Sequence, residues 1–256
     1  MKAADLFQLG DIHAPQILAV EKDFLVAYKP PRMHSAPLPH SGRKDSFFGW
    51  CAQQFPEIAG LRGRRAGEGG LLHRLDYETQ GLLLLGRTQA GLDALAAQQN
   101  DGAISKEYHA RATTRNVQPA GFPAPAPILS GEIESAFRPY GPGRKAVRPV
   151  FAGGTGSPQS RLYVTQIIES RPCECGITSF RLRIVRGFRH QIRCHLAWLR
   201  RPILNDAQYG GEPFGGGLLA LRACALLFAD PATGTRRAFS IPPINSPLKC
   251  CANIVD

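Results

Sequence analysis

Residues 73–87 read HRLDYETQGLLLLGR, so a polar loop runs directly into an apolar strand. Four consecutive leucines, Leu82–Leu85, are typical of a strand that is buried on both faces of a sheet. Asp76 is therefore expected in a loop at the rim of a central strand, close to the cation of Arg74. Such a carboxylate can serve chemistry, or it can simply pair with Arg74 or cap a turn.

Segments on both sides of this stretch predict a mixed α+β fold. Apolar alternation predicts two strands within residues 17–29, separated by a turn at 21–23. The other expected strands are 81–87, 104–112, 131–137, 147–152, 161–169 and 177–185, with a closing hairpin of 220–229 and 237–241. The expected helices follow a cap at Asp45 or Ser46 as far as Phe55, follow a cap at Thr88 as far as Gln99, and run amphipathically from His190 to Arg200. This pattern indicates a mixed, mainly antiparallel central sheet with flanking helices.

The expected domain organisation is simple. Residues 1–16 form a lead-in, and residues 17–256 form a single domain. Residues 57–70 are expected to be a mobile basic loop, and the proline-rich residues 117–129 a surface excursion. No apolar stretch approaches the roughly 20 residues of a spanning helix, and the first residues lack an apolar signal core. We therefore expect a cytoplasmic protein, with a monomer as the default state.

The composition favours a polyanionic partner. The chain has 31 Lys and Arg against 20 Asp and Glu, which gives a formal net charge of +11 at pH 7. Of these basic residues 24 are Arg, whose planar guanidinium contacts phosphate bidentately and stacks on bases. The excess disfavours a cationic ligand and favours nucleic acid or, less simply, an anionic membrane surface.

Residues 175–205 form a basic block without any Asp or Glu. Its basic residues are Arg181, Arg183, Arg186, Arg189, Arg193, Arg200 and Arg201, together with His190 and His195. A solvated cationic face is one interpretation. The absence of acids within the block prevents local neutralisation, so a surface that follows phosphates is the better one.

No cofactor or metal is expected. The 7 Cys are scattered, and neither Cys173-x-Cys175 nor Cys250-Cys251 has the ligand spacing of common zinc sites. Reduced thiols are the simplest expectation. No glycine-rich phosphate loop is present either.

Four motifs follow one another along the chain: His73-Arg74-Leu75-Asp76 with Thr79 and Gly81, Lys106-Glu107-Tyr108, Gly187–Leu196, and Pro202–Gly210. Together with opening strands that end in Lys29-Pro30, they resemble the RluA family of RNA pseudouridine synthases. One such motif would be weak evidence, but collinear motifs across residues 17–241 are specific. The resemblance implies a pseudouridine synthase catalytic domain, in the form without the N-terminal RNA-binding extension.

The resemblance also implies a role for each site residue. Asp76 would be the catalytic carboxylate, acting as a nucleophile on the sugar or as a base on a ribose proton. Arg193 would hold this carboxylate ionised in a partly dehydrated site, and Tyr108 would stack on the flipped uracil. The residues expected to contact RNA are His73, Arg74, Lys106, Arg189, His190 and Gln191.

Three residues depart from the family pattern, and two other functions compete with this one. Gln80, Phe188 and Asn205 stand where the family usually has Ser, Arg and Gly, and Arg189 is expected to replace the missing cation. A glycoside hydrolase would need a second carboxylate, and Asp206 more simply braces a turn or a helix end. A non-catalytic RNA-binding protein would share the charge. The favoured function is therefore pseudouridine formation in ribosomal or transfer RNA, without an obligate protein partner.

Overall fold

The computed structural model describes residues 5–38, 45–114, 119–124, 131–151, 161–172 and 176–244. The chain divides into two compact units. The first unit comprises Met1–Lys106 and Arg222–Pro243, and the second comprises Glu107–Leu221 and Ile244–Asp256. That residues 17–256 act as one catalytic domain stays a prediction.

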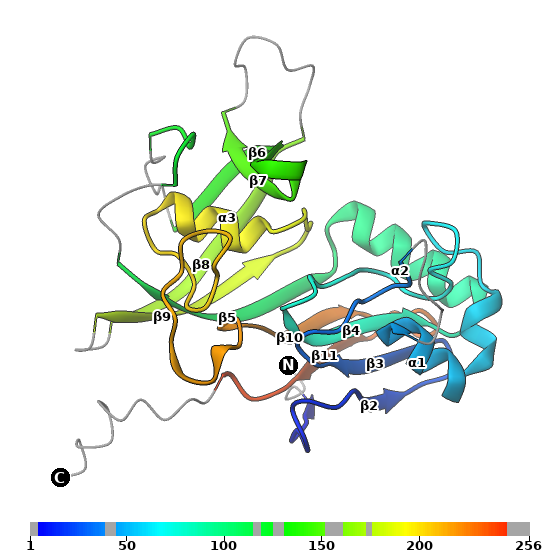
Figure 1. The fold of residues 1–256 in the computed structure, drawn as a ribbon. Coiled ribbons are helices and arrows are strands. Elements are labelled where there is room, and N and C mark those ends of the chain that lie inside the picture. Colours follow the sequence, from blue (N-terminus) through cyan, green and yellow to red (C-terminus); the bar gives the residue numbers. More distant parts are fainter. Residues whose placement is uncertain are drawn as a thin grey trace. The chain divides into compact units, whose positions relative to one another are not determined.

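The first unit is built on a mixed sheet (Figure 1). Its strands, in the order in which they neighbour one another, are β2 (Gln16–Val20), β3 (Phe24–Lys29), β4 (Gln80–Gly86), β10 (Leu221–Ala229), β11 (Arg236–Ser240) and β1 (Asp5–Leu6). The β4–β10 and β1–β11 pairs are parallel, whereas the other pairs are antiparallel. The short strand β1 was not predicted, and it places part of the expected lead-in within the sheet.

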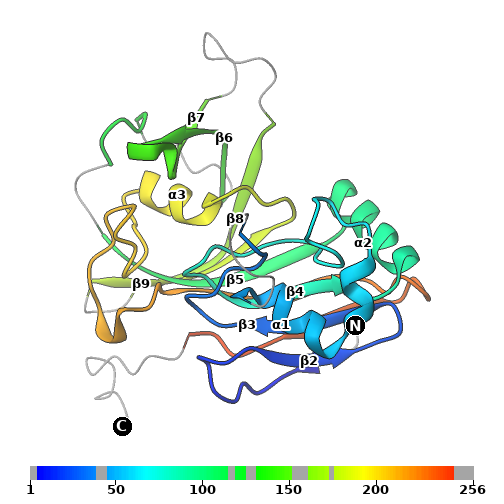
Figure 2. The same cartoon turned by 45° about the vertical axis from the view of Figure 1, so that its right-hand side comes forward.

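Leucines of β4 are buried on both faces, as the apolar run predicts. On one face, Leu84 shares a core cluster with Leu92 and Leu95 of α2 (Gln89–Asp101). Helix α1 (Phe47–Gln54) lies beside β3 (Figure 2) and buries Phe47 and Phe48 completely.

Both helices of the first unit begin at the predicted caps. Ser46 and Thr88 each accept a hydrogen bond from the backbone N–H three residues later, which satisfies one of the free donors of the first turn. The next segment begins with a 3-10 helix, η2 (Pro56–Gly60), so the prediction of a mobile basic loop over 57–70 did not include the helical turn at its start.

Gly81 of the signature loop has a steric role. Its φ is +132°, and a Cβ atom there would lie 2.3 Å from the carbonyl oxygen of Ala223 on β10. Only glycine therefore permits β4 and β10 to approach this closely.

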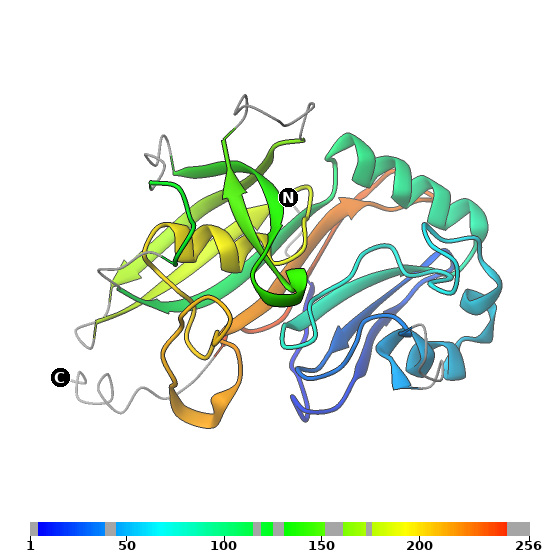
Figure 3. The same ribbon diagram turned by 45° about the horizontal axis from the view of Figure 1, so that its top comes forward.

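The described part of the second unit contains a sheet and the α-helix α3 (Figure 3). Its neighbouring strands are β5 (Ser105–Thr113), β9 (Ile177–Ile184), β8 (Tyr163–Pro172), β6 (Glu132–Tyr140) and β7 (Ala146–Val150). The β6–β7, β6–β8 and β8–β9 pairs are antiparallel. Short 3-10 helices, η3 (Pro142–Arg144) and η4 (Gly215–Gly217), complete the unit. The predicted fold class, a mixed and mainly antiparallel α+β protein, is confirmed.

Helix α3 (Gln191–Trp198) differs from the amphipathic helix that the sequence predicts, because all eight of its residues are buried. Cys194 contacts the Val147 carbonyl of β7, and Gln191 contacts the Val164 carbonyl of β8. At the end of the helix, the indole N–H of Trp198 donates to the carbonyls of Pro123 and Ala124. Segments distant in sequence therefore cover the polar side of the helix.

Several other expectations concern only part of the chain. Parts of the proline-rich stretch, residues 117–118 and 125–129, lie outside the described residues, as do the thiols of Cys173, Cys175, Cys250 and Cys251. Cys51, Cys194 and Cys224 are free thiols. In the part of the chain that the structure describes, no helix is long and apolar enough to cross a membrane, and no group of three side chains is arranged to hold a metal ion.

Candidate active site

Asp76 lies in the loop before β4, and hydrogen bonds hold the backbone of the residues on either side of it. The hydroxyl of Ser35 donates to the carbonyl of Leu75 (2.7 Å) and accepts from its N–H (3.0 Å). The carbonyl of Tyr77 accepts from the N–H of Met33 (3.3 Å), and that of Asp76 accepts from Thr79 N–H (3.1 Å). The backbone is thus fixed around a half-buried carboxylate.

The fully buried side chain of Lys29, at the end of β3, also supports this loop. Its ammonium donates to the carbonyls of Pro30 (2.7 Å), Met33 (2.8 Å) and Tyr77 (3.4 Å). Burial lowers the pKa of Lys29 to about 7, and the carboxylates of Asp76 and Glu78 oppose this shift. The Lys29 side chain therefore holds the turn that carries Asp76 by hydrogen bonds, although the sequence indicated only a strand end here.

His73 and Arg74 have different environments in this loop. The Nε2 atom of His73 accepts a hydrogen bond from Leu84 N–H (3.3 Å). Burial, and to a lesser extent the charge of Lys106, lower the pKa of His73 well below its usual value, so the ring is neutral. Arg74 is half exposed and forms an ion pair with Glu68 (3.5 Å). The turn thus presents Arg74 to solvent and holds His73 as an uncharged anchor.

Lys106 and Tyr108 lie on the same buried face of β5, since their side chains are two residues apart. Tyr108 is 6% exposed and Lys106 is 4% exposed. Burial lowers the pKa of Lys106 to about 8. Their expected contacts with RNA stay predictions.

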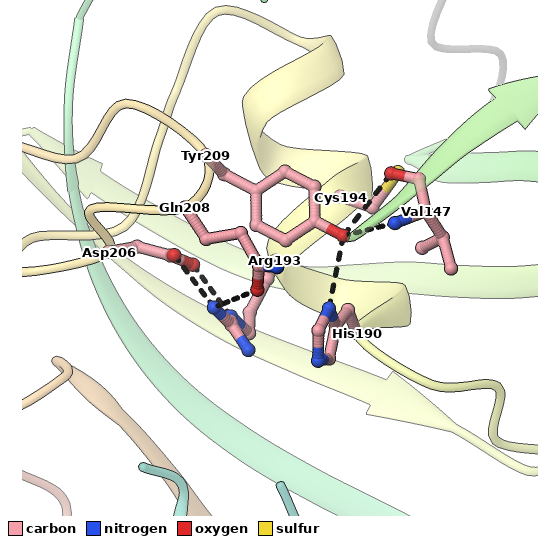
Figure 4. Close-up of polar contacts among 7 residues, drawn as sticks. All are labelled: Val147, His190, Arg193, Cys194, Asp206, Gln208 and Tyr209. Carbon is pink, nitrogen blue, oxygen red and sulfur yellow. Dashed lines mark hydrogen bonds and ion pairs between the residues drawn. The ribbon is translucent and has the colours of Figure 1, made fainter. Parts of the chain in front are cut away.

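Arg193 of α3 is held by a carboxylate of its own unit (Figure 4). Its Nε and Nη2 atoms donate to the two carboxylate oxygens of Asp206 at 2.7 and 2.8 Å, and Nη2 also donates to Gln208 (3.1 Å). Asp206 is fully buried and the Arg193 side chain is 8% exposed. The guanidinium thus forms a bidentate pair with Asp206, and the expected pairing of Arg193 with Asp76 stays a prediction.

Tyr209 joins Arg193 to the beginning of α3. The guanidinium lies over the Tyr209 ring at 5.3 Å from its centroid. The hydroxyl accepts from Val147 N–H (2.9 Å) and lies 3.2 Å from Nδ1 of His190 (Figure 4). His190 has a left-handed backbone (φ 56°) at the N-cap of α3. The segment after the helix therefore fixes both Arg193 and His190.

The remaining residues of the expected RNA contact set have internal partners. Gln191 is 2% exposed and donates to Val164 and Thr165, while its oxygen accepts from Phe188 N–H. Arg189 is exposed and donates to the carbonyls of Arg144 and Ala146. The side chain of Gln191 is thus engaged within the unit, and the expected RNA contacts of Gln191 and Arg189 stay predictions.

Carboxylates from outside residues 175–205 partly neutralise the basic block, contrary to the local argument. Arg183 pairs with Glu107 (2.7 Å) and Arg181 lies 3.9 Å from Glu169. His195 is fully buried between Ser135 and Thr165, and burial lowers its pKa to about 3. It is therefore a neutral core residue.

Each departure from the family pattern has a local structural partner. Gln80 accepts from Tyr28 and from the buried Arg222, through a single amide oxygen. Phe188 stacks on Phe137 at 5.0 Å. Asn205 adopts φ 64°, a conformation that suits Gly or Asn, and its side chain bonds to the backbone of Phe214 and Leu218.

The predicted site residues therefore form two groups, one in each unit. His73, Arg74 and Asp76 share one loop of the first unit, and Arg189, His190 and Arg193 surround the start of α3 in the second. The pairing of Asp76 with Arg193 and the position of Tyr108 relative to them stay predictions. Sequence reasoning missed Ser35, Lys29 and Tyr209 as supports. The Lys29-Pro30 pair and the Pro202–Gly210 motif, which contains Tyr209, gave a signal, whereas nothing pointed to Ser35.

Comparisons with known proteins identify the family of the chain. Residues 23–198 match the family described as RNA pseudouridylate synthase. The chain is 30% identical over 224 residues to the ribosomal large subunit pseudouridine synthase C of Salmonella typhimurium, covering 81% of this chain and 63% of the relative. It is also 30% identical over 187 residues to the ribosomal large subunit pseudouridine synthase D of Vibrio vulnificus, covering 68% and 52%. The chain thus spans between half and two thirds of the length of these curated relatives.

A solved structure shares the fold. Human RNA Pseudouridylate Synthase Domain Containing 4 superimposes with a TM-score of 0.60 at 18% identity, covering 90% of this chain and 89% of that one. The family match includes the Asp76 loop, β5 and all of α3. This chain belongs to the RNA pseudouridylate synthase family.

Proposed function

We propose that the protein is an RNA pseudouridine synthase that isomerises specific uridines in structured ribosomal or transfer RNA. The reaction breaks the bond between N1 of uracil and C1′ of the ribose, turns the base, and rejoins it through C5. The proton on C5 leaves and N1 gains one, so no net hydrolysis occurs. The names of the relatives and the family match support this assignment.

The observation that carries the proposal is the fixed backbone around Asp76. Ser35 binds both backbone groups of Leu75, while Lys29 and Met33 bind the carbonyl of Tyr77. A catalytic group that reacts at a single ribose carbon needs such positioning, since small displacements cost large factors in rate. A carboxylate that merely solubilises a surface loop needs no such support.

The roles of the partners follow from their chemistry. Arg193, oriented by Asp206, would stabilise the carboxylate of Asp76 and the charge that develops on the flipped nucleotide. Tyr108 would stack on the extruded uracil, and exposed Arg74 would occupy the space that the base leaves in the RNA. Extrusion costs a few kcal/mol, which several phosphate contacts would offset.

Replacement of Asp76 tests the proposal against the competing function, a non-catalytic RNA-binding protein. Pseudouridine should be mapped across total RNA from cells with the wild-type protein, with Asp76→Asn, and without the protein. We expect sites that require the wild-type protein and are lost with Asp76→Asn, although the variant binds the same RNA. Identical maps in all three strains would favour the binding protein. Glu57→Gln, which alters an exposed ion pair with Arg87, is the control and should preserve every site.

A further inference from the structure

The segment between η2 and the Asp76 loop carries three arginines in four residues (cyan in Figure 1). Arg62, Arg64 and Arg65 are all exposed. The sequence predicted a mobile loop here. The structure instead shows a tightly held backbone, and this difference changes what the arginines can do.

Glycines fasten the segment to its surroundings. A Cβ atom on Gly63 would lie 2.1 Å from the carbonyl oxygen of Gly69, and one on Gly70 would lie 2.2 Å from that of Gly86. The N–H of Gly70 donates to the carbonyl of Ile58 (2.9 Å), and the carbonyl of Gly70 accepts from Gly86 N–H (2.8 Å). The returning half of the segment is therefore packed against η2 and the end of β4 without room for side chains.

The arginine-bearing half has separate anchors. The side-chain oxygen of Gln89, at the start of α2, accepts from Arg62 N–H (2.9 Å), and its amide donates to the Arg62 carbonyl (3.4 Å). Glu68 N–H donates to the Arg65 carbonyl (3.2 Å) and closes the turn between them. Three cations thus project from a fixed backbone, which reduces the entropy lost when they bind.

Neighbouring carboxylates do not neutralise these arginines. Glu57 is engaged by Arg87 through two hydrogen bonds, at 3.0 and 2.8 Å, and Glu68 pairs with Arg74. Across the described residues, no carboxylate lies within 4.0 Å of the guanidinium groups of Arg62, Arg64 or Arg65. An exposed cluster of uncompensated guanidinium groups is suited to a ligand with closely spaced negative charges.

The segment is also linked to the catalytic loop. Glu68 follows Arg65 by one turn and binds Arg74, two residues before Asp76. We propose that Arg62, Arg64 and Arg65 form a docking surface for the phosphate backbone of the substrate RNA, next to the nucleotide presented to Asp76. This inference rests on the proposed function, because that function makes RNA the polyanion concerned.

The salt dependence of RNA binding tests the docking surface. The probe is unmodified large-subunit ribosomal RNA transcribed in vitro, and dissociation constants are measured over a range of salt concentrations. Each lost phosphate contact should reduce the slope of log affinity against log salt by roughly 0.7 to 0.9. For a triple variant, Arg62→Gln with Arg64→Gln and Arg65→Gln, we expect the slope to fall by about 2 to 3. Replacing the same three residues by Lys should preserve most of the slope, because the charges remain.

A matched triple variant controls for net charge. Lys22→Gln, Arg161→Gln and Arg236→Gln remove the same charge from exposed positions elsewhere, and the slope should change by much less. Equal slopes and affinities for the two triple variants would overturn the proposal. Loss of binding to phosphatidylserine vesicles with unchanged RNA affinity would also overturn it, in favour of a membrane surface.

Turnover separates this inference from the proposed function. At saturating RNA the docking variant should keep the wild-type kcat, with a raised KM. A lowered kcat with unchanged affinity would contradict a docking role. If the wild-type protein forms no pseudouridine but its RNA affinity depends on these arginines, the proposed activity fails and the docking surface stands.

Discussion

Removing the carboxylate of Asp206 should destabilise the second unit strongly. Asp206 has two charge-assisted hydrogen bonds with Arg193, at 2.7 and 2.8 Å, and both side chains are at least nine-tenths buried. Breaking a buried ion pair by removing one partner leaves an uncompensated charge and costs about 3–5 kcal/mol. Asp206→Ala should therefore lower the free energy of unfolding by about that amount. By contrast, loss of the exposed Glu57–Arg87 pair in Glu57→Gln should cost about 1 kcal/mol or less.

Intrinsic fluorescence can follow this unit separately. The chain has two tryptophans: Trp50 lies in α1 of the first unit, and Trp198, fully buried, lies in α3 of the second. A Trp50→Phe background leaves Trp198 as the reporter in urea titrations. A local reporter is preferable because a chain with two compact units need not unfold in a single step. The shift in the midpoint, at unchanged slope, gives the change in stability.

A double-mutant cycle decides whether the loss belongs to the pair. In an Arg193→Ala background, Asp206→Ala should cost much less than in the wild type, because no buried cation remains to be compensated. An equal cost in both backgrounds would show that Asp206 acts through other contacts. A loss no larger than that of Glu57→Gln would refute the structural reasoning about the pair.

Three further substitutions have defined outcomes. Burial lowers the pKa of Lys29 from 10.5 to about 7 in the folded state, so the unfolded chain binds more protons between these pH values. The free energy of unfolding should therefore rise between about pH 6.5 and 8.5, by about 2 kcal/mol more in the wild type than in Lys29→Met. Equal pH profiles of stability for the two proteins would contradict the lowered pKa. Gln80→Ala should cost about 2–4 kcal/mol in denaturant titrations, since Tyr28 and Arg222 both lose a buried acceptor, whereas near-neutrality would show that water replaces it. Ser35→Ala should lower kcat at least tenfold with little change in RNA affinity, because the clamp at Leu75 is lost; unchanged kcat would show that the Asp76 loop does not need it.

Local signals predicted most of the elements correctly. The apolar alternation of β2 and β3, the four leucines of β4, and the caps at Ser46 and Thr88 are properties of short segments. Predictions failed where distant segments decide the environment. The burial of α3 depends on β7, β8 and residues 123–124, which no periodicity within the helix could reveal.

The candidate site shows the same division between local and distant information. The motifs located Asp76, Tyr108 and Arg193 by residue type and order. Their supports come from other segments: Ser35 and Lys29 reach the Asp76 loop from about 40 residues earlier in the sequence. The charge of the basic block was misjudged for the same reason, since Glu107 and Glu169 precede it in the sequence and Asp206 follows it.

The three residues that depart from the family pattern are compatible with an active site, because each of them has bonding or packing partners within its own unit. Gln80 is 2% exposed and directs its oxygen to Tyr28 and Arg222, so a longer side chain than Ser fills the distance to a buried cation. Phe188 stacks on Phe137 where the family usually has a cation, so under the proposed function the RNA affinity that this cation would supply must come from other cations. The exposed arginines at 62–65 are well suited to supply it, because their backbone is fixed and no described carboxylate neutralises them. Arg189 is a weaker substitute, since carbonyls of Arg144 and Ala146 already hold its guanidinium.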